Sequence, residues 1–199
     1  MIDEGYTKFD VDWQRAPGVE GPAIRELDKW RRLLFDAGLV GHDADLDVGY
    51  GNLSIRDSDG FLISGTQTGH LETTGPEHYA RVTAVDANRN RVSCIGPVQA
   101  SSESMTHAAI YAAAPWVKAV VHAHDLALWD ASLDQIPTTS REIAYGTPAM
   151  AMELERLVVE TDFPTLGIAA MGGHEAGLIA VGENLEEAAN RMLAFAERR

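Results

Sequence analysis

The sequence predicts an α/β fold with a mixed β-sheet. Two stretches show strand-like alternation on either side of a polar turn, which is typical of antiparallel hairpins. Helical patterns alternate with short apolar runs in the rest of the chain. The 199 residues, 45% of them apolar, suffice for one core and are few for two. We expect an irregular N-terminal arm over residues 1–18 and a single domain over residues 19–199.

The first helix is predicted within GVEGPAIRELDKWRRLLFDAGLVG, where apolar residues recur at helical spacing. Pro22 suits the first turn, because the missing N–H of proline has no helical partner there. Gly38 or Gly41 can end the helix, since glycine readily takes the left-handed conformation that follows a last turn.

Two hairpins are expected after this helix. GNLSIRDSDGFLISG predicts strands at residues 53–56 and 61–64 around a turn at residues 57–60. ARVTAVDANRNRVSCIG has the same pattern, with its turn near residues 86–90.

The second half of the chain alternates helices and buried strands. SSESMTHAAIYAAA predicts a helix that Pro115 stops, and VKAVVHAH predicts a short buried strand. A short helix is expected from Asp125 and another from TPAMAMELERLVVET, with Pro148 in its first turn. Two further strands, near LGIAAMG and GLIAVG, precede a final helix in NLEEAANRMLAFAERR.

Composition restricts the partners of the chain. Thirty acidic against sixteen basic residues give a formal charge of −14, which disfavours nucleic acid and anionic membranes. An anionic substrate would have to be bound by local groups such as helix N-termini, hydroxyls or a metal. The single cysteine, Cys94, excludes an internal disulfide, and the acidic N-terminus lacks a signal-peptide pattern, so we expect a cytoplasmic protein.

Two histidines end the apolar strand in KAVVHAHDLAL. Side chains at positions i and i+2 of a strand share a face, so His122 and His124 can direct their imidazoles at one point. Zinc binds neutral imidazole well, and a catalytic zinc site needs three protein ligands and one open position. An isolated pair of this kind is more often two ordinary histidines, so the pair alone does not establish a metal site.

The best candidate for a third ligand is His174, in a glycine-rich turn between two apolar strands. A rigid element holds a ligand more accurately than a loop, which favours His174 over the other histidines. The rivals are His42, His70, His78 and His107.

The segment QASSESMTHAAIY supplies hydroxyls and a carboxylate where a helix is expected to begin. The hydroxyls of Ser101 and Ser102, with the free N–H groups of the first turn, could bind a phosphate. Serine at a helix start needs no ligand to explain it, so this interpretation is not specific alone. Glu103 is a candidate proton acceptor beside a cation, and His107, one turn further on, could orient it or be a core residue.

Two glycine-bearing stretches complete the candidate groups. Asn52 follows Gly51 in GYGNLSIR, and SGTQTGH offers Thr66, Thr68 and the nearby backbone N–H groups. Neither stretch has the spacing of a Walker loop or a dinucleotide fingerprint, so ATP and NAD are not expected.

In their order along the chain, these pieces resemble the class II aldolase/adducin family. GNLSIR, FLISGT, SSES at a helix start, VVHAHD and a glycine-flanked histidine before GLIAVG carry the resemblance, which covers residues 24–197. It implies a three-layer α/β/α domain around a mixed, largely antiparallel sheet. It also implies a homotetramer with the active site near a subunit interface.

The resemblance also implies roles for individual residues. His122, His124 and His174 match the metal ligands of fuculose phosphate aldolase and its relatives, and Glu103 matches their acid/base carboxylate. The matches to the substrate- and phosphate-binding positions are Gly51, Asn52, Thr66, Ser101 and Ser102. The metal would be Zn²⁺ or another divalent cation such as Mn²⁺ or Co²⁺.

Three departures from the family pattern stand out. Glu175 and Ala176 intervene between His174 and the next glycine, and Gln67 stands where the sugar-phosphate enzymes have glycine. The chain also lacks, after its last helix, the longer tail whose tyrosine acts in many sugar-phosphate members. Tyr145 is the candidate substitute.

The function implied by the resemblance is a metal-dependent lyase. It would cleave a small hydroxy-carbonyl substrate, a sugar phosphate, by a retro-aldol reaction through a metal-stabilised enediolate. The alternatives are a sugar-phosphate epimerase, dehydratase or decarboxylase with the same metal site. Two non-catalytic alternatives also remain, an adducin-like interaction domain and a metal store.

Overall fold

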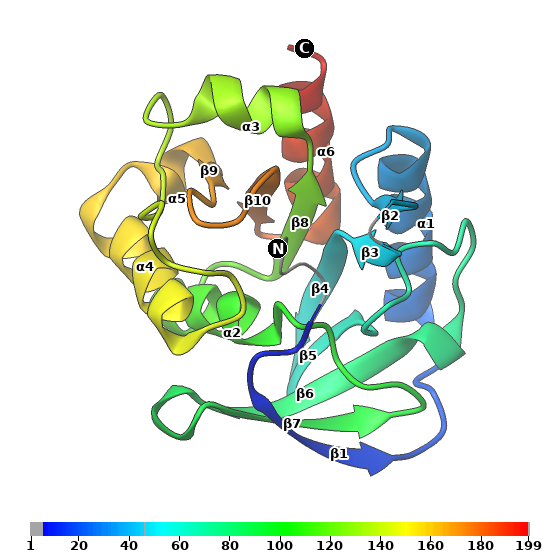
Figure 1. The fold of residues 1–199 in the computed structure, drawn as a ribbon. Helices are drawn as coiled ribbons and strands as arrows, with labels where there is room; N and C mark the ends of the chain where they lie inside the picture. Colours follow the sequence, from blue (N-terminus) through cyan, green and yellow to red (C-terminus); the bar gives the residue numbers. More distant parts are fainter. Residues whose placement is uncertain (1–5, 46, 199) are drawn as a thin grey trace.

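The computed structural model describes residues 6–45 and 47–198, and its main feature is an eight-stranded mixed sheet (Figure 1). Only the pair at one edge, β1 and β7, is parallel, and the other neighbouring pairs are antiparallel. Across the sheet, the strands are β1 (Asp10–Arg15), β7 (Arg91–Gly96), β6 (Tyr79–Asp86), β5 (Gly60–Ser64), β4 (Asn52–Asp57), β8 (Ala119–His124), β10 (Gly177–Gly182) and β9 (Ile168–Ala170).

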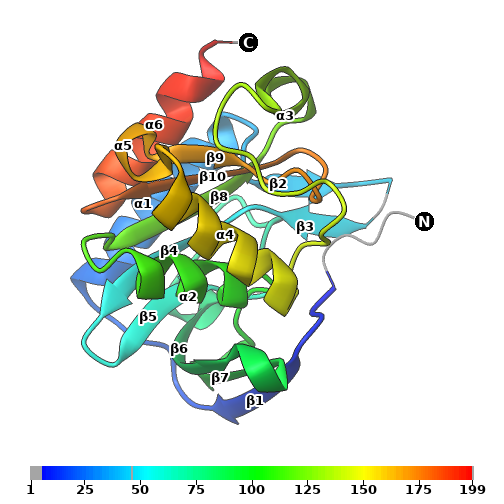
Figure 2. The same ribbon diagram turned by 90° about the vertical axis from the view of Figure 1, so that its left-hand side faces the viewer.

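Helices cover both faces of the sheet, which confirms the three-layer α/β/α prediction (Figure 2). Residues of α1 (Pro22–Asp36) and α6 (Leu185–Ala196) pack into a core on one face. Residues of α2 (Ser104–Ala113) and α4 (Pro148–Glu160) pack into a second core on the other face. The two cores arise because successive strand residues point to opposite faces: Val121 joins the α1/α6 side, and Val120 joins the α2/α4 side.

The remaining elements are short. They are a two-stranded sheet of β2 (Gly41–Asp43) and β3 (Val48–Tyr50), the helices α3 (Leu126–Ser132) and α5 (Phe163–Leu166), and the 3₁₀ turns Pro76–His78 and Ala87–Arg89.

The helix ends follow the signals in the sequence. Helix α1 begins at Pro22, and Gly38 lies just beyond its C-terminus with a φ of 73°. Three other helices begin at a side chain that accepts a backbone N–H, as expected of Asx and Thr N-caps. These caps are Asp125 for α3, Thr147 for α4 and Asn184 for α6.

The irregular arm predicted over residues 1–18 is wrong for residues 10–15, which form β1. Residues 1–5 lie outside the described part. Strand β1 adds to the edge of the sheet because Val11 and Trp13 pack against the α2/α4 core, and the Trp13 indole N–H donates to the Gly96 carbonyl at 2.9 Å. The prediction also omitted β2, β3 and α5.

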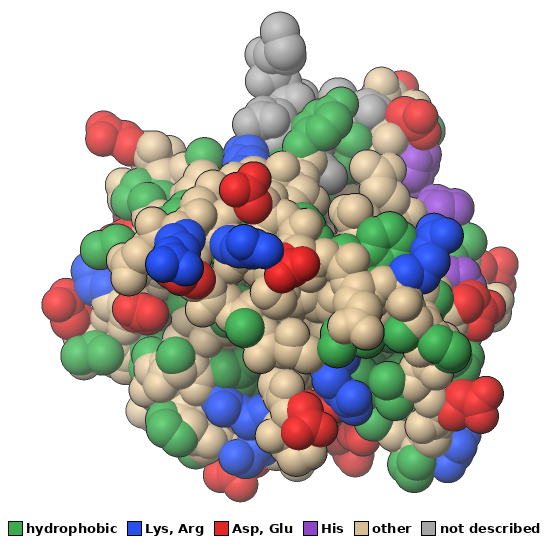
Figure 3. Space-filling view, turned by 90° about the horizontal axis from the view of Figure 1, so that it is seen from below, with side chains coloured by type: hydrophobic (Ala, Val, Ile, Leu, Met, Phe, Trp, Pro, Cys, Tyr) green, Lys and Arg blue, Asp and Glu red, His purple; other side chains and the backbone are tan. Residues whose placement is uncertain are grey.

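None of the described helices has the length and apolar composition needed to cross a membrane. On the face shown in Figure 3, acidic, basic and apolar side chains are interspersed. Despite the net charge of −14, the acidic side chains form no continuous patch on that face.

Candidate metal centre

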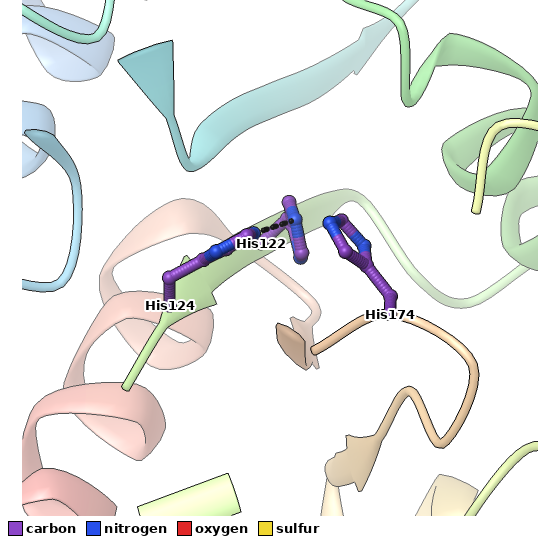
Figure 4. A group of neighbouring side chains, drawn as sticks. All are labelled: His122, His124 and His174. Atoms are coloured by element: carbon purple, nitrogen blue, oxygen red, sulfur yellow. Dashed lines mark hydrogen bonds between the residues drawn. The ribbon is translucent and has the colours of Figure 1, made fainter. Parts of the chain in front are cut away.

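Three histidines converge at the end of β8 (Figure 4). His122 and His124 project from β8 on one face, and His174 reaches them from the turn before β10. The Nε2 atoms of His122 and His124 are 3.0 Å apart, and one ring nitrogen from each residue lies within 4.8 Å of the others. The ring centroids are 4.7 to 4.9 Å apart.

The surroundings of His122 prepare it to bind a cation. Its Nδ1 donates to the Leu178 carbonyl at 3.0 Å, so in the neutral ring Nε2 carries the free lone pair. Burial, followed by the neighbouring histidines, lowers the pKa of His122 well below its usual value, and burial also lowers the pKa of His124. Three imidazoles facing one another, two of them buried and one partly buried, fit a divalent metal such as zinc.

The two residues inserted after His174 do not move it out of the cluster. The His174 N–H donates to the Met171 carbonyl, and the Gly177 N–H donates back to the His174 carbonyl. Ala176 absorbs the extra length in a left-handed conformation, with a φ of 64°. Glu175 is exposed and is not part of the ligand group.

Three of the four rival histidines have other hydrogen-bond partners, and the fourth, His70, lies with its ring 6.1 Å from that of His42. His42 bonds to Asp47, and His78 accepts the Gly75 N–H. His107 is buried, and its Nδ1 lies 2.7 Å from the Ser54 hydroxyl oxygen. Among the residues that the structure describes, only the 122/124/174 group gathers three possible ligands.

A pocket opens beside the histidines and collects every site residue that the sequence predicts. Besides the three histidines, it is lined by Gly51, Asn52, Thr66, Ser101, Ser102, Glu103 and Tyr145. The Glu103 carboxylate is 2% exposed, and its Oε1 lies 3.9 Å from His174 Nδ1. A carboxylate this close to the cluster can exchange a proton with a molecule held there.

The serine segment differs from the prediction in one respect. Helix α2 begins at Ser104, and Glu103 rather than a serine occupies the N-cap position, with no side-chain cap. The Ser101 hydroxyl instead accepts the Glu103 N–H at 3.2 Å, which closes a turn before the helix. Ser101 and Ser102 still line the pocket.

The first glycine stretch is tightly built. Gly51 has a φ of 76°, and a Cβ there would lie 2.8 Å from Val40. Asn52 pairs with His122 across β4 and β8, and its buried Oδ1 has no hydrogen-bond partner among the described residues. A buried amide oxygen without a hydrogen-bond partner is energetically unfavourable. Because Asn52 lines the pocket, this oxygen indicates that a polar molecule binds there.

In the second glycine stretch, Gln67 adopts the left-handed backbone conformation that glycine favours. Gln67 has a φ of 61°, a conformation that costs a residue with a side chain roughly 1 kcal/mol. The Thr68 hydroxyl donates to the Gly65 carbonyl at 2.8 Å and so holds the loop. Thr66 and Gln67 line the pocket.

Tyr145 lies beside the cluster. Its ring stacks on His174 at a centroid distance of 4.4 Å, and Lys8 Nζ sits 3.8 Å from the centroid of the Tyr145 ring. The phenol oxygen accepts the backbone N–H of Tyr6 at 3.0 Å. The N-terminal segment therefore holds Tyr145 against the histidine.

Tyr50 is a pocket residue that the sequence analysis missed. Its ring stacks on His124 at 5.4 Å, and burial raises the pKa of its phenol. Its position next to Gly51 and Asn52 is the one signal in the sequence that could have identified it.

The fold and the cluster define a class of protein: a three-layer α/β domain with a three-histidine, metal-type centre at the end of a central strand. The sequence profile of the "Class II Aldolase and Adducin N-terminal domain" matches residues 29–198. The chain therefore belongs to the class II aldolase and adducin family. Comparison with curated proteins finds no match.

Solved structures share this fold. L-fuculose-1-phosphate aldolase from Thermus thermophilus has a TM-score of 0.67 at 22% identity, over 88% of this chain and 89% of that one. The sugar-phosphate aldolase from Thermotoga maritima has a TM-score of 0.67 at 17% identity, over 88% and 90%. YgbL from Escherichia coli, described as an aldolase, epimerase or decarboxylase, has a TM-score of 0.63 at 23% identity, over 87% and 84%. At such identities the likeness shows the fold alone.

Proposed function

We propose that this protein is a metal-dependent lyase that cleaves a small hydroxy-carbonyl substrate, a sugar phosphate, by a retro-aldol reaction. One observation carries the proposal: the buried Glu103 carboxylate and the three histidines meet in a pocket that also contains hydroxyls and glycine loops. A cation site alone would explain the histidines, but it would not explain the buried carboxylate and the polar lining of the pocket.

Each group has a proposed part in the reaction. His122, His124 and His174 would hold zinc, manganese or cobalt, which when bound polarises the substrate carbonyl as a Lewis acid. Glu103 would carry the proton to and from the carbon at the broken bond.

The other pocket groups would hold the substrate. Asn52, Thr66 and the serines at 101 and 102 would hold its anionic end. Tyr145 is a second proposed catalytic residue, and its use requires the bond from Tyr6 to be exchanged for one to the substrate. We further propose a cytoplasmic homotetramer with the site near a subunit interface.

Related reactions are the main alternative. An epimerase, dehydratase or decarboxylase would use the same metal and carboxylate, and the description of the YgbL structure names epimerase and decarboxylase activities beside aldolase. A non-catalytic interaction domain or a metal store would have no need for a buried carboxylate beside the cluster.

A substrate screen tests this proposal. Metal-loaded protein is incubated with phosphorylated and unphosphorylated ketoses, and the products are analysed for aldehyde, inverted stereocentre, lost water or carbon dioxide. Release of an aldehyde supports the lyase. The E103Q variant should keep the metal and lose turnover by at least about 100-fold. Equal turnover in E103Q and wild type would exclude Glu103 from the chemistry.

A further inference from the structure

Arg31 is a buried charge on the apolar face of α1. Its side chain is 2% exposed and donates to three backbone carbonyls, those of Leu71 at 2.6 Å, Thr68 at 2.8 Å and Gly69 at 3.1 Å. Buried arginines usually pair with carboxylates. Within the described ranges Arg31 makes no ion pair, so backbone oxygens alone satisfy its guanidinium.

The three carbonyls belong to the loop at residues 65–71, of which residues 65–69 line the pocket. In a trans peptide the C=O and the following N–H point in opposite directions. Because Arg31 draws the carbonyls of Thr68 and Gly69 toward α1, the N–H groups of Gly69 and His70 point away from α1. Among the described residues, the N–H groups at positions 67–70 have no acceptor.

The N–H side of this loop meets the first glycine stretch. A Cβ on Gly49 would lie 2.9 Å from the Gly69 nitrogen, and a Cβ on Gly69 would lie 2.2 Å from the Gly41 carbonyl oxygen. Gly49 and Gly69 both line the pocket. Arg31 therefore fixes one loop directly and the other through this glycine contact.

Asp28, one turn earlier on α1, anchors the far end of the same segment. Its Oδ1 accepts from the Thr74 hydroxyl at 2.6 Å and from the Tyr79 phenol at 2.8 Å. The segment is thus tied to α1 at two points, and its shape is set by a helix that contributes no residue to the pocket.

The charge of Arg31 has a second consequence. A guanidinium hydrogen-bonded to the carbonyl end of a peptide strengthens the positive end of that peptide dipole. This effect makes the Gly69 and His70 N–H groups better donors to an anion, while the nearby Asp28 carboxylate offsets part of the Arg31 charge. A neutral amide side chain has only two N–H donors for these three carbonyls and carries no positive charge.

We propose that Arg31 is a positioning residue that sets the orientation of the Gly69 and His70 N–H groups at the edge of the pocket and thereby makes the pocket selective for a phosphorylated substrate. The proposal rests on the proposed function only for the identity of the reaction. What it adds is that Arg31, by holding the loop, raises the affinity of the pocket for an anion.

The test uses the metal-loaded protein and inorganic phosphate as the probe. Calorimetry should give a phosphate Kd at least about 10-fold weaker in R31M than in wild type and an intermediate value in R31K, which keeps charge but loses the planar fork. With an active ketose pair, R31M should raise KM for the phosphorylated substrate, leave kcat nearly unchanged and spare the unphosphorylated substrate. Metal content should be unaffected.

Arg191 provides the control. Its guanidinium also donates to a backbone carbonyl, that of Val181 at 2.6 Å, and it pairs with Glu187, but Val181, unlike the loop that Arg31 holds, does not line the pocket. R191M should therefore leave phosphate binding at the wild-type value. A merely structural role for Arg31 would lower the thermal stability of R31M and leave its phosphate Kd at the wild-type value.

Hydrogen exchange on the wild-type protein tests the proposed anion-binding amides even if R31M fails to fold. Phosphate should slow exchange at the amides of Gly69 and His70. Absence of that protection, absence of phosphate binding by wild type, or unchanged phosphate affinity in the Arg31 variants would overturn the inference. Phosphate binding that depends on Arg31, in a protein without lyase activity, would instead count against the proposed function alone.

Discussion

Individual residues differ in how far the sequence revealed their roles. The alternation of a strand is enough to predict that His122 and His124 share a face, and the structure places both rings there. The position of His174 depends on a turn whose conformation is set by Ala176 in the left-handed region, which a sequence pattern does not contain. The sequence contains one sign of the role of Arg31: the helical spacing of α1 predicts an apolar residue at this position.

His107 gives a prediction about pH. Complete burial lowers its pKa to about 3, whereas in the unfolded chain the value is near 6.5. The unfolded state therefore binds the proton first, and the contribution of His107 to stability is present above pH 6.5 and is lost as the pH falls toward 3. Between pH 7.5 and pH 5 this residue should account for a loss of about 2 kcal/mol.

Denaturant unfolding of metal-loaded wild type and H107Q measures this effect. H107Q should be less stable at pH 7.5, because the bond to Ser54 is altered, but its stability should fall less between pH 7.5 and pH 5. If the two proteins lose equal stability over that interval, His107 is not the group that titrates.

At the scale of elements, local signals located most helices and both hairpins. Pro22, Asp125, Thr147 and Asn184 mark helix starts because each has a local reason to be there. The omitted strand β1 is different, since only its pairing with β7, some eighty residues away, makes it a strand. The short β2 and β3 likewise depend on contact with the glycine loops.

The contact between the two glycine loops gives a prediction at this scale. G69A should destabilise the protein by several kcal/mol and weaken substrate binding, because the new Cβ would meet the Gly41 carbonyl oxygen at 2.2 Å. G38A is the control: it has a φ of 73° but no neighbour within 4 Å, so it should cost only about 1 kcal/mol. Chemical denaturation compares the two, and equal losses would show that the clash is relieved by a small shift.

At the scale of the whole molecule, the order of the motifs predicted the family and the three-layer fold. The pocket itself could not be predicted from pattern alone, because it joins segments near residues 50, 67, 102, 123, 145 and 174 that lie far apart in the chain. The electrostatic balance is also a property of the whole chain: with a charge of −14, an anionic substrate would need local groups such as the proposed cation and the proposed N–H donors.

Metal binding should also stabilise the whole molecule. The ion would bind the folded cluster and not the unfolded chain, so at 100 times its Kd it adds about 2.7 kcal/mol. For a chain of this length, removal by a chelator should lower Tm by roughly 5 to 10 °C. Calorimetry with and without chelator measures the shift, and the H174A variant, which lacks one proposed ligand, should show a much smaller shift.

The most direct test of the central claim is the metal content of the purified protein. Elemental analysis of wild type, after exposure to zinc and removal of the excess, should give one divalent ion per chain. H70A, which removes a histidine outside the cluster, should give the same value, and H174A should give much less. If wild type holds no stoichiometric zinc, manganese or cobalt, or if H174A retains as much metal as H70A, then His122, His124 and His174 are not a metal centre.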